Sequence, residues 1–600
     1  MLEELQELFE HDIYAKTYGN AFTDKIEQLA RVITQEYTKP NEFNVFALEA
    51  GLGKSKYTNH IISKNLYDFG KTRKYLVVKK FKEGVEEMEK ALSHFNPPKG
   101  YDDKPNILGI TADNWGAWRL NTEKLKHVSV LIITHKRYID LALNDELRQA
   151  FSDDRDVLII DEKVSFPIYS FSKSYYDNVR SILPFNLQAD FDKVCNRILK
   201  ELQIQGVDKK NLNKCVRVEL NIHPVTLNHF LEVMEVNIEN FLNLKERNSV
   251  QHFLEGLELW YSTKCVYNGG NISTFNRKHM LWGLQNNIIL DASSNVDGIY
   301  QISNSYKVIG EERIIDHRNS TFFHINFNTS KSNLNHNQER YFKEVAEKIV
   351  EHNERGENNQ TLIICHKDNY KKIEEQMLRL RIADIAIPNN TDTIENNVDN
   401  VITERFAINW FGNLIGKNAY ADFTQCWIIG TPNIPYEQYL IHYMMYAREE
   451  HLGNKSLDIE RGRFKNNDFN KVQNGYLASE IYQSIKRIQR NERPEGDFFI
   501  VNSDKAIVKK ILKQIKGTDN QQEKEFQFVQ EQKKNKKRDK VDELVDYLMR
   551  LPEGEYQKKD IIEELSLTNL NRLLTDTRVK DLVETGHINI NYRKIVKLKN

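Results

Sequence analysis

The chain has 600 residues, of which 40% are hydrophobic and 28% charged, and its formal net charge is -1. This length exceeds what one hydrophobic core supports, so the sequence predicts several domains of a soluble globular protein. A near-neutral total charge excludes a basic field over the whole molecule, so any nucleic-acid surface must be a local basic patch.

The 5 cysteines are scattered, and none forms a C-x-x-C pair or stands at metal-ligand spacing. This pattern excludes a disulfide framework and a recognisable zinc or iron–sulfur site, and it indicates free thiols in a reducing compartment. The acidic, amphipathic start of the chain does not have the pattern of a signal peptide. No apolar stretch is long enough to span a bilayer, so we expect a cytoplasmic protein with no membrane partner.

A glycine-rich turn follows the first apolar run. Residues 20–38 have helical periodicity, and residues 44–48 then predict a buried strand. The strand runs into the sequence EAGLGKS, residues 49–55, after which helical periodicity resumes. Strand, glycine-rich turn and helix is the order of a P-loop unit.

Short apolar runs recur along the chain, at residues 75–78, 130–133, 157–160 and 287–290. Strands buried on both faces need no alternation of polar residues, so these runs predict a parallel sheet covered by helices on both sides. The polar residues 328–338 then predict a connection between two lobes. More runs follow at residues 361–365, 426–429 and 498–501, so the strand–helix pattern occurs twice.

The glycine-rich turn carries the strongest chemical signal. Backbone N–H groups in such a turn hold phosphate oxygens, and glycines leave room for that approach. Lys54 would neutralise the phosphates and the Ser55 hydroxyl would ligate Mg²⁺, although Leu48 stands where the motif usually has its first glycine. The turn therefore predicts a site for ATP and Mg²⁺. The expected ATP-binding residues are Gly51, Leu52, Gly53, Lys54, Ser55 and Lys56.

Two carboxylates, Asp161 and Glu162, follow the apolar run at 157–160. Open α/β sheets bind ligands at the carboxyl ends of their strands, which is where this pair lies. Asp161 would hold Mg²⁺ together with Ser55, and Glu162 would orient or activate the attacking water. The alternative is a strand-end turn with solvated acids, which the P-loop disfavours.

A third element lies near the end of the second strand–helix set. On a helix, Gln483, Arg487 and Arg490 would share a face, because they are spaced by four and three residues. Arginines from a second lobe can reach the γ-phosphate and stabilise the transition state. The alternative is a solvated helix face.

Together these motifs resemble those of superfamily 2 helicases and translocases over residues 40–505. GLGKS is similar to motif I, Asp161-Glu162-Lys163-Val164 to the DExx box, and Gln483, Arg487 and Arg490 to motif VI, although Lys486 stands where a glycine is common. Weaker similarities lie between them: Thr134-His135-Lys136 (motif Ib), Asp291-Ala292-Ser293 (motif III), Ile364-Cys365-His366 (motif IV), and Phe411-Gly412 through Gly416-Lys417-Asn418 (motif V).

The resemblance implies roles for these positions. Catalysis would involve Glu162, Gln483, Arg487 and Arg490. Nucleic acid would contact Thr134, His135, Lys136, Arg137, His366, Lys367, Lys417 and Asn418. Coupling between hydrolysis and movement would involve Asp291, Ser293, Gly412 and Gly416.

The stretch between motifs II and III is long and has helical patterning. It resembles the arch-type insertion of repair helicases, although residues 56–160 contain no cysteine for the iron–sulfur cluster of those enzymes. Near the end, the basic run EQKKNKKRDK predicts a charged linker, and three helices and a hairpin then suggest a winged-helix-like domain for DNA binding or protein docking.

The predicted fold is thus α/β: two RecA-like parallel-sheet lobes with a mainly helical insertion and a small C-terminal winged-helix-like domain. The predicted boundaries are 1–164 and 282–320 for the first lobe, 165–281 for the insertion, 321–517 for the second lobe, 518–540 for the linker and 541–600 for the last domain.

The expected function is an ATP-dependent DNA helicase or translocase that acts on single-stranded or forked DNA. The resemblance favours a role in replication, recombination or repair of a bacterial, phage or mobile-element genome, and the insertion or tail could bind a protein partner. Two alternatives stay open: an ATPase switch gated by nucleic acid or a partner without unwinding, and an RNA helicase.

Overall fold

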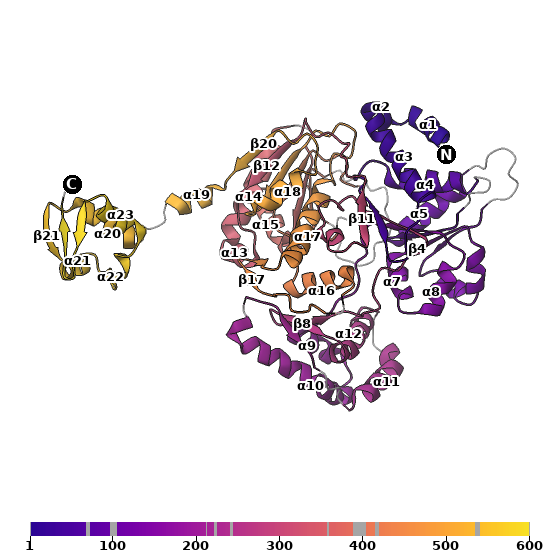
Figure 1. Cartoon of the computed structure of the whole chain (residues 1–600), viewed down its shortest axis with the longest axis horizontal. Helices are drawn as coiled ribbons and strands as arrows, with labels where there is room; N and C mark the ends of the chain where they lie inside the picture. Colours follow the sequence, from indigo (N-terminus) through magenta and orange to yellow (C-terminus); the bar gives the residue numbers. More distant parts are fainter. Residues whose placement is uncertain are drawn as a thin grey trace. The chain divides into compact units, whose positions relative to one another are not determined.

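The computed structural model describes residues 2–67, 73–95, 105–211, 213–220, 225–240, 244–356, 359–387, 404–413, 419–449, 451–534 and 540–598. The chain divides into two compact units, Met1–Lys524 and Glu525–Asn600, and each is described by itself. The first unit holds two parallel sheets of seven strands each, and a smaller antiparallel sheet is inserted into the sequence of the first one (Figure 1).

All strand pairs of the first sheet are parallel. In spatial order its strands are β11 (Tyr306–Ile309), β1 (Phe43–Phe46), β10 (Asn286–Leu290), β5 (Val157–Asp161), β2 (Tyr75–Lys79), β4 (Val130–Thr134) and β3 (Ile107–Ile110). Its helices are α1 (Leu2–Glu10), α2 (Ile13–Tyr18), α3 (Asn20–Thr34), α4 (Lys54–Asn65), α5 (Lys82–Ser93), α6 (Trp115–Trp118), α7 (His135–Leu141) and α8 (Asp145–Ser152).

Each face of this sheet belongs to a different hydrophobic core. Along β5, Val157 and Ile159 pack into the core that α1 to α5 cover, whereas Leu158 and Ile160 point into the opposite core. Both sets are fully buried, which is why the run reads as continuously apolar. Because the strands are parallel, their carboxyl ends meet along one edge, where Asp161 pairs in register with Leu290, and Lys79 with Thr134.

The second sheet is also parallel throughout. Its strands are β14 (Ile385–Ala386), β15 (Phe406–Trp410), β13 (Thr361–Cys365), β16 (Gln425–Ile428), β19 (Asp497–Val501), β12 (Thr321–Ile325) and β20 (Gln521–Lys524). Its helices are α13 (Lys331–His336), α14 (Gln338–Asn353), α15 (Tyr370–Arg379), α16 (Tyr436–Ala447), α17 (Asn467–Ile485) and α18 (Lys505–Leu512). The two sheets confirm the predicted α/β fold with two RecA-like lobes.

Two segments differ from the sequence-based expectation. The chain crosses between lobes before β12, so the polar residues 328–338 are not the connection; they form α13, whose first turn is capped by the Ser330 hydroxyl. Asparagine and serine are favoured at helix caps as well as in linkers, and composition alone does not separate the two. Residues Gln521–Lys524, assigned to the linker, pair with β12 as an edge strand.

The two lobes share one core. The cluster on the Leu158 face of the first sheet continues into Tyr439 and Met444 of α16 and Phe469 of α17, all from the second lobe. The backbones also meet closely, because the 3₁₀ turn η4 (Gly298–Gln301) packs against α17. The lobes are therefore in contact through closely packed side chains over this part of their interface.

The insertion is an antiparallel sheet wrapped by helices. Its strands are β6 (Tyr169–Ser172), β9 (Asn271–Thr274), β8 (Cys265–Asn268) and β7 (Val216–Val218), and its helices are α9 (Lys173–Ile182), α10 (Phe185–Val207), α11 (Leu227–Asn237) and α12 (Leu244–Ser262). It also pairs with the second lobe: the Cys215 N–H donates to the Leu457 carbonyl at 3.0 Å, and the Ile459 N–H to the Asn213 carbonyl at 2.7 Å. These bonds lie beside the short hairpin β17 (Ile459–Glu460) and β18 (Arg463–Phe464).

The C-terminal unit has its own core around Leu544, Leu548 and Ile595. Its elements are α19 (Gln527–Lys534), α20 (Lys540–Arg550), β21 (Gly554–Gln557), α21 (Lys558–Glu564), α22 (Leu570–Leu573), α23 (Thr577–Glu584), β22 (Ile588–Ile590) and β23 (Lys594–Lys597). Helices and a terminal hairpin were expected here, and the winged-helix assignment stays a prediction.

All 5 cysteines are free thiols in buried positions. Across the described parts of the chain, no helix combines the length and the apolar character that a membrane crossing requires.

Candidate nucleotide site

The glycine-rich turn lies at the carboxyl edge of the first sheet, between β1 and α4. Gly51 and Gly53 have φ angles of 99° and 74°, which L side chains rarely adopt, so glycine is required at both positions. Leu52 is buried beneath the turn. Lys54 is the first residue of α4, and Ser55 follows it on the exposed side of the helix, where phosphate groups bind in such units.

Asp161 is held by two lysines. The ammonium group of Lys54 lies 2.5 Å from one carboxylate oxygen of Asp161, and that of Lys79 lies 2.6 Å from the other. Burial would raise the pKa of this carboxyl group, but the two ammonium groups hold it well below its ordinary value. Asp161 is therefore ionised, and its charge is shared by two cations.

Lys79 is a site residue that the sequence analysis missed. It ends β2, which pairs directly with β5, and the parallel register brings its side chain to Asp161 across 82 residues of sequence. The only sequence signal was a lysine directly after a predicted buried strand, which marks the carboxyl edge of the sheet but not its partner.

The backbone departs from the extended conformation of β5 at Glu162. Its φ angle is 72°, and its N–H donates to the Leu290 carbonyl at 3.0 Å. The ammonium group of Lys80 lies 3.8 Å from its carboxylate. Glu162 also interacts electrostatically with Arg487 and Arg490 of the second lobe.

The predicted helix through Gln483, Arg487 and Arg490 is wrong in its extent. Helix α17 ends at Ile485, and the chain then turns through Gln489, whose φ angle is 49°. Both arginines lie on this turn instead of a helix face, since a left-handed residue cannot continue an α-helix. The turn still brings Arg490 to the P-loop: a methyl group built on Gly51 would lie 4.0 Å from its Cβ.

Burial and the neighbouring Arg487 lower the pKa of Arg490 to about 9. Arg487 is also buried. The Arg490 Nε–H donates to the Lys486 carbonyl at 2.8 Å, and the two guanidinium groups lie close enough to repel each other electrostatically. Adjacent guanidinium groups are suited to binding phosphate oxygens.

Ser293 connects the lobes at the expected coupling position. Its hydroxyl donates to Asp291 at 2.7 Å, while the Ser479 hydroxyl and the Gln483 amide of the second lobe donate to it at 2.8 and 3.2 Å. Gln483 thus reaches the first lobe, but through Ser293.

Lys486, which departs from the family pattern, is buried in a polar cluster behind the P-loop. Its ammonium group lies 3.5 Å from the Glu49 carboxylate and 2.9 Å from the His317 ring. Glu49 is fully buried and accepts from the Ile314 and Ile315 N–H groups at 2.6 and 3.2 Å. The glycine-to-lysine departure is therefore explained by a buried ion pair that joins the two lobes.

Lys56, another predicted nucleotide ligand, lies apart from this site. Its ammonium group is 2.6 Å from the Asp12 carboxylate, which also caps α2. Lys56 therefore ties α4 to the N-terminal helices.

The site residues fit a Mg²⁺–nucleotide pair rather than a bare metal. No group of three or more His, Cys, Asp or Glu side chains in the described residues could hold a metal ion. Mg²⁺ in nucleotide enzymes commonly takes one or two carboxylates and completes its shell with phosphates and waters. Asp161 and Ser55 supply that smaller set.

The predicted nucleic-acid residues follow β4 and β13. Thr134 caps α7, and Lys136 is exposed. Arg137 lies with its guanidinium 4.1 Å from the Trp115 ring. His135 is buried and its Nε2 lies 2.9 Å from the Asp161 carbonyl, so its side chain has no open face for a strand.

In the second lobe, His366 packs edge-on against Phe411, and Lys367 lies over the Trp410 ring. Gly412 has a φ angle of 82°. Gly416, Lys417 and Asn418 lie outside the described residues.

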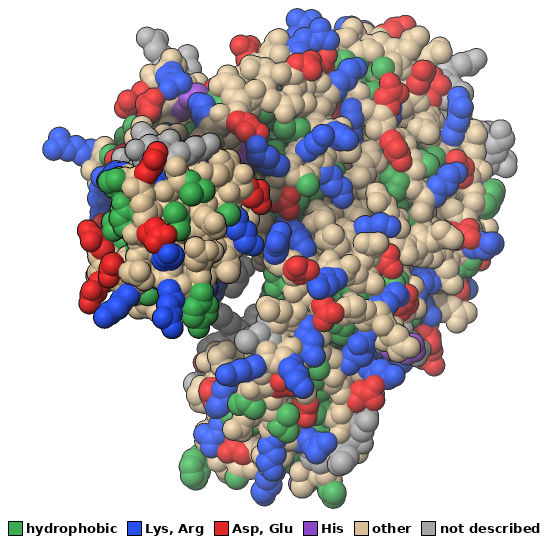
Figure 2. All heavy atoms as spheres, turned by 60° about the vertical axis from the view of Figure 1, so that its left-hand side comes forward, with side chains coloured by type: hydrophobic (Ala, Val, Ile, Leu, Met, Phe, Trp, Pro, Cys, Tyr) green, Lys and Arg blue, Asp and Glu red, His purple; other side chains and the backbone are tan. Residues whose placement is uncertain are grey.

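The surface agrees with the charge argument. Figure 2 shows Lys and Arg side chains interspersed with Asp and Glu over the visible face, without one extended field of a single sign.

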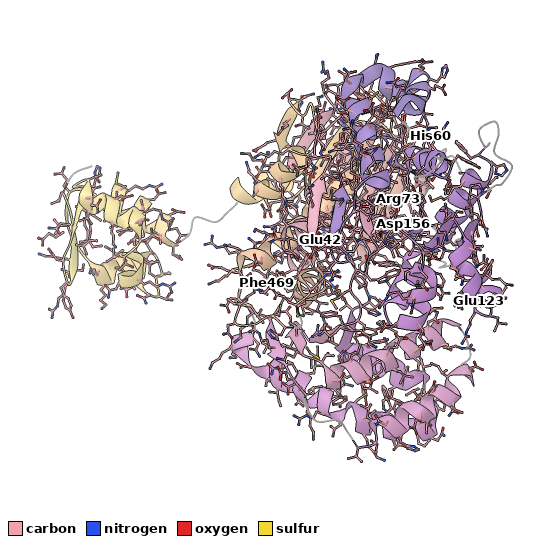
Figure 3. All side chains as sticks on the ribbon, turned by 45° about the vertical axis from the view of Figure 1, so that its right-hand side comes forward. Glu42, His60, Arg73, Glu123, Asp156 and Phe469 are labelled. Atoms are coloured by element: carbon pink, nitrogen blue, oxygen red, sulfur yellow. The ribbon has the colours of Figure 1, made fainter. Side chains whose placement is uncertain are left out.

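A hollow of about 980 Å³ lies at the amino edge of the first sheet, where Lys74 and Asp156 precede β2 and β5. Arg73 and Asp156 are labelled near this edge in Figure 3. It lies at the opposite edge of the sheet from the glycine-rich turn.

The chain was compared with known proteins. No protein-family model and no curated protein sequence matches it. Among solved structures, it is similar to one titled XPD_APO, with 13% identity, a TM-score of 0.54, and coverage of 84% of this chain and 99% of that chain. It is likewise similar to one titled XPD_Helicase, with 14% identity, a TM-score of 0.53 and the same coverage. The chain shares the fold of these two structures.

Proposed function

We propose that the protein is an ATP-dependent motor that moves along, and separates, single-stranded or forked DNA. The observation that carries the proposal is the charged site between the lobes: Lys54 pairs with Asp161 in the first lobe, and Arg487 and Arg490 of the second lobe interact electrostatically with the adjoining Glu162. A triphosphate between them would satisfy both halves. DNA is favoured over RNA by the resemblance to repair enzymes.

In this proposal each residue has a distinct task. The P-loop N–H groups and Lys54 bind the phosphates, and Glu162 takes the proton of the attacking water. Arg487 and Arg490 stabilise the charge that develops on the transferred phosphoryl group. Mg²⁺, when bound with ATP, supplies further charge neutralisation between Asp161 and the phosphates.

Coupling to movement is proposed to run through Ser293. Its hydrogen bonds to Ser479 and Gln483 join the carboxyl edge of the first sheet to the helix that leads to the arginines. Hydrolysis of the bound nucleotide would therefore alter the contact between the lobes. In this proposal, that change moves one lobe relative to the other.

The first test is ATP hydrolysis with single-stranded DNA, single-stranded RNA, duplex DNA and no nucleic acid. We expect single-stranded DNA to stimulate hydrolysis strongly and Lys54→Ala to abolish it, because the phosphates lose their main cation. A strand-displacement assay at both polarities follows. Hydrolysis by Lys54→Ala at the wild-type rate would contradict the assigned site.

A partner-gated ATPase switch is the second candidate. It is favoured by the packed lobe interface, where α16 and α17 share a core with the first sheet. A switch needs only one conformational change each time it binds a partner, whereas a motor needs the lobes to move repeatedly. Hydrolysis that no nucleic acid stimulates, or stimulated hydrolysis without strand separation at either polarity, would favour the switch.

Lys79 gives a prediction about metal dependence. In Lys79→Met, we expect half-maximal binding of a fluorescent ATP analogue at about tenfold lower Mg²⁺, because one charge-assisted contact no longer competes for Asp161. A Mg²⁺ titration of analogue binding measures this.

Lys80→Met is the matched control for this titration, since Lys80 lies beside Glu162 instead of Asp161. An unchanged or higher Mg²⁺ requirement in Lys79→Met would show that Lys79 does not compete with the metal.

A further inference from the structure

One aromatic cluster in the first lobe has no role in the nucleotide site. Trp115 and Trp118 form the short helix α6, and both pack on the rim of the core while remaining partly exposed. Neither indole N–H has a hydrogen-bond partner within the described part of the chain. Rings with one face on a core and a polar tip in water are typical of recognition surfaces.

The sheet order places this cluster on the same edge as the nucleotide site. Helix α6 follows β3, and α7 follows its parallel neighbour β4, so both begin at the carboxyl edge. Moving outward along that edge, β5 ends in Asp161, β2 in Lys79, β4 in Thr134, and β3 leads to α6. Figure 3 labels Glu123, which lies in the turn after α6, at the outer margin of the first lobe.

One cation lies directly against the Trp115 ring. The Arg137 guanidinium stacks over Trp115, whose ring also contacts Phe151 at a centroid distance of 5.9 Å. Among the described residues, no carboxylate lies within ion-pair distance of Arg137. Lys136 is 88% exposed, and its ammonium group lies 3.8 Å from the Asp140 carboxylate on the same helix, an exposed pair that water and ligands can readily open. Arg137 is therefore oriented by the indole, and its N–H groups remain available to an anion.

The backbone beneath the rings is fixed. The Asn114 side chain donates to the Gly109 carbonyl at 2.7 Å and accepts from the Thr111 N–H at 3.0 Å. The Arg119 N–H donates to the Trp115 carbonyl at 2.8 Å. A rigid pair of rings loses little entropy when a flat ligand stacks on it.

We infer that Trp115, Trp118, Lys136 and Arg137 form a platform that binds an unpaired nucleobase and its flanking phosphates. The base stacks on the exposed face of Trp118, and the phosphates contact Arg137 and Lys136. Stacking on aromatic rings combined with a cationic track is how single strands are held without sequence preference. The inference rests on the proposed function, since it assigns a base-binding site to the same motor.

The test uses the full chain and two oligonucleotides of equal length, oligo(dT) and an abasic strand that has the same phosphates. We expect Trp118→Ala to weaken oligo(dT) binding about tenfold, the range that stacking on one aromatic side chain contributes. Binding of the abasic strand is expected to be unchanged. Arg137→Gln, in contrast, is expected to weaken binding of both strands.

Leu120→Ala is the matched control, because Leu120 is 83% exposed beside the platform but has no ring. Trp118→Phe is expected to recover most of the oligo(dT) affinity, which a loss of folding would not allow. If Trp118→Ala binds oligo(dT) as tightly as the wild type does, the platform is wrong and the proposed function is not affected. A wild-type chain that binds neither strand would overturn the proposed function together with the platform.

Discussion

Replacing Glu162 with glutamine is expected to reduce the turnover number of ATP hydrolysis about a thousandfold and to leave nucleotide affinity unchanged. General-base catalysis contributes roughly 10²- to 10⁴-fold, and an amide cannot accept the proton of the attacking water. The substitution is isosteric, and the Glu162 backbone keeps its N–H bond to the Leu290 carbonyl. Steady-state hydrolysis and binding of a fluorescent ATP analogue measure the two effects separately.

The control is Glu87→Gln, an exposed carboxylate on α5 of the same lobe, for which no change is expected. Loss of both hydrolysis and analogue binding in Glu162→Gln would assign Glu162 to binding instead of catalysis. Unchanged hydrolysis would remove it from the reaction.

Replacing Gly475 with alanine is expected to slow hydrolysis about a hundredfold by forcing the lobes apart. A methyl group on Gly475 would lie 2.0 Å from the backbone nitrogen of Gly298, and one on Gly298 would lie 2.2 Å from the Lys471 carbonyl oxygen. Backbone atoms cannot rotate away, so the overpacking strain is about 3 kcal/mol. A misplacement of about 1 Å can cost 10²-fold in rate.

Hydrolysis and limited proteolysis of the lobe contact measure this effect, with near-UV circular dichroism as the check that each lobe stays folded. Gly116→Ala is the matched control, because a methyl group there would meet nothing within 4 Å. Wild-type hydrolysis in Gly475→Ala would show that the Gly298–Gly475 contact does not set the geometry of the site.

The parts of the fold that depend on local pattern could be predicted from the sequence. Continuously apolar runs identified strands such as β5, because burial on both faces leaves no polar alternation. The glycine-rich turn was predictable because its glycines meet a local backbone demand, which the φ angles of Gly51 and Gly53 confirm. The similarity to the XPD structures confirms the expected fold.

The parts that depend on register and long-range contact could not be predicted. Lys79 and Lys486 are ordinary lysines in sequence, and their partners Asp161 and Glu49 become neighbours only through strand order and lobe packing. The end of α17 was also missed, because a single left-handed residue, Gln489, redirects the chain without a glycine or proline to signal it. The roles assigned to the nucleic-acid residues stay predictions.

The attachment of the insertion has a mechanical consequence. The insertion leaves and re-enters the first lobe, yet its Cys215 and Asn213 are bonded to Leu457 and Ile459 of the second. The insertion is therefore attached to both lobes, covalently to the first and by hydrogen bonds to the second. Any relative displacement of the lobes therefore either breaks these two hydrogen bonds or tilts the insertion with the second lobe.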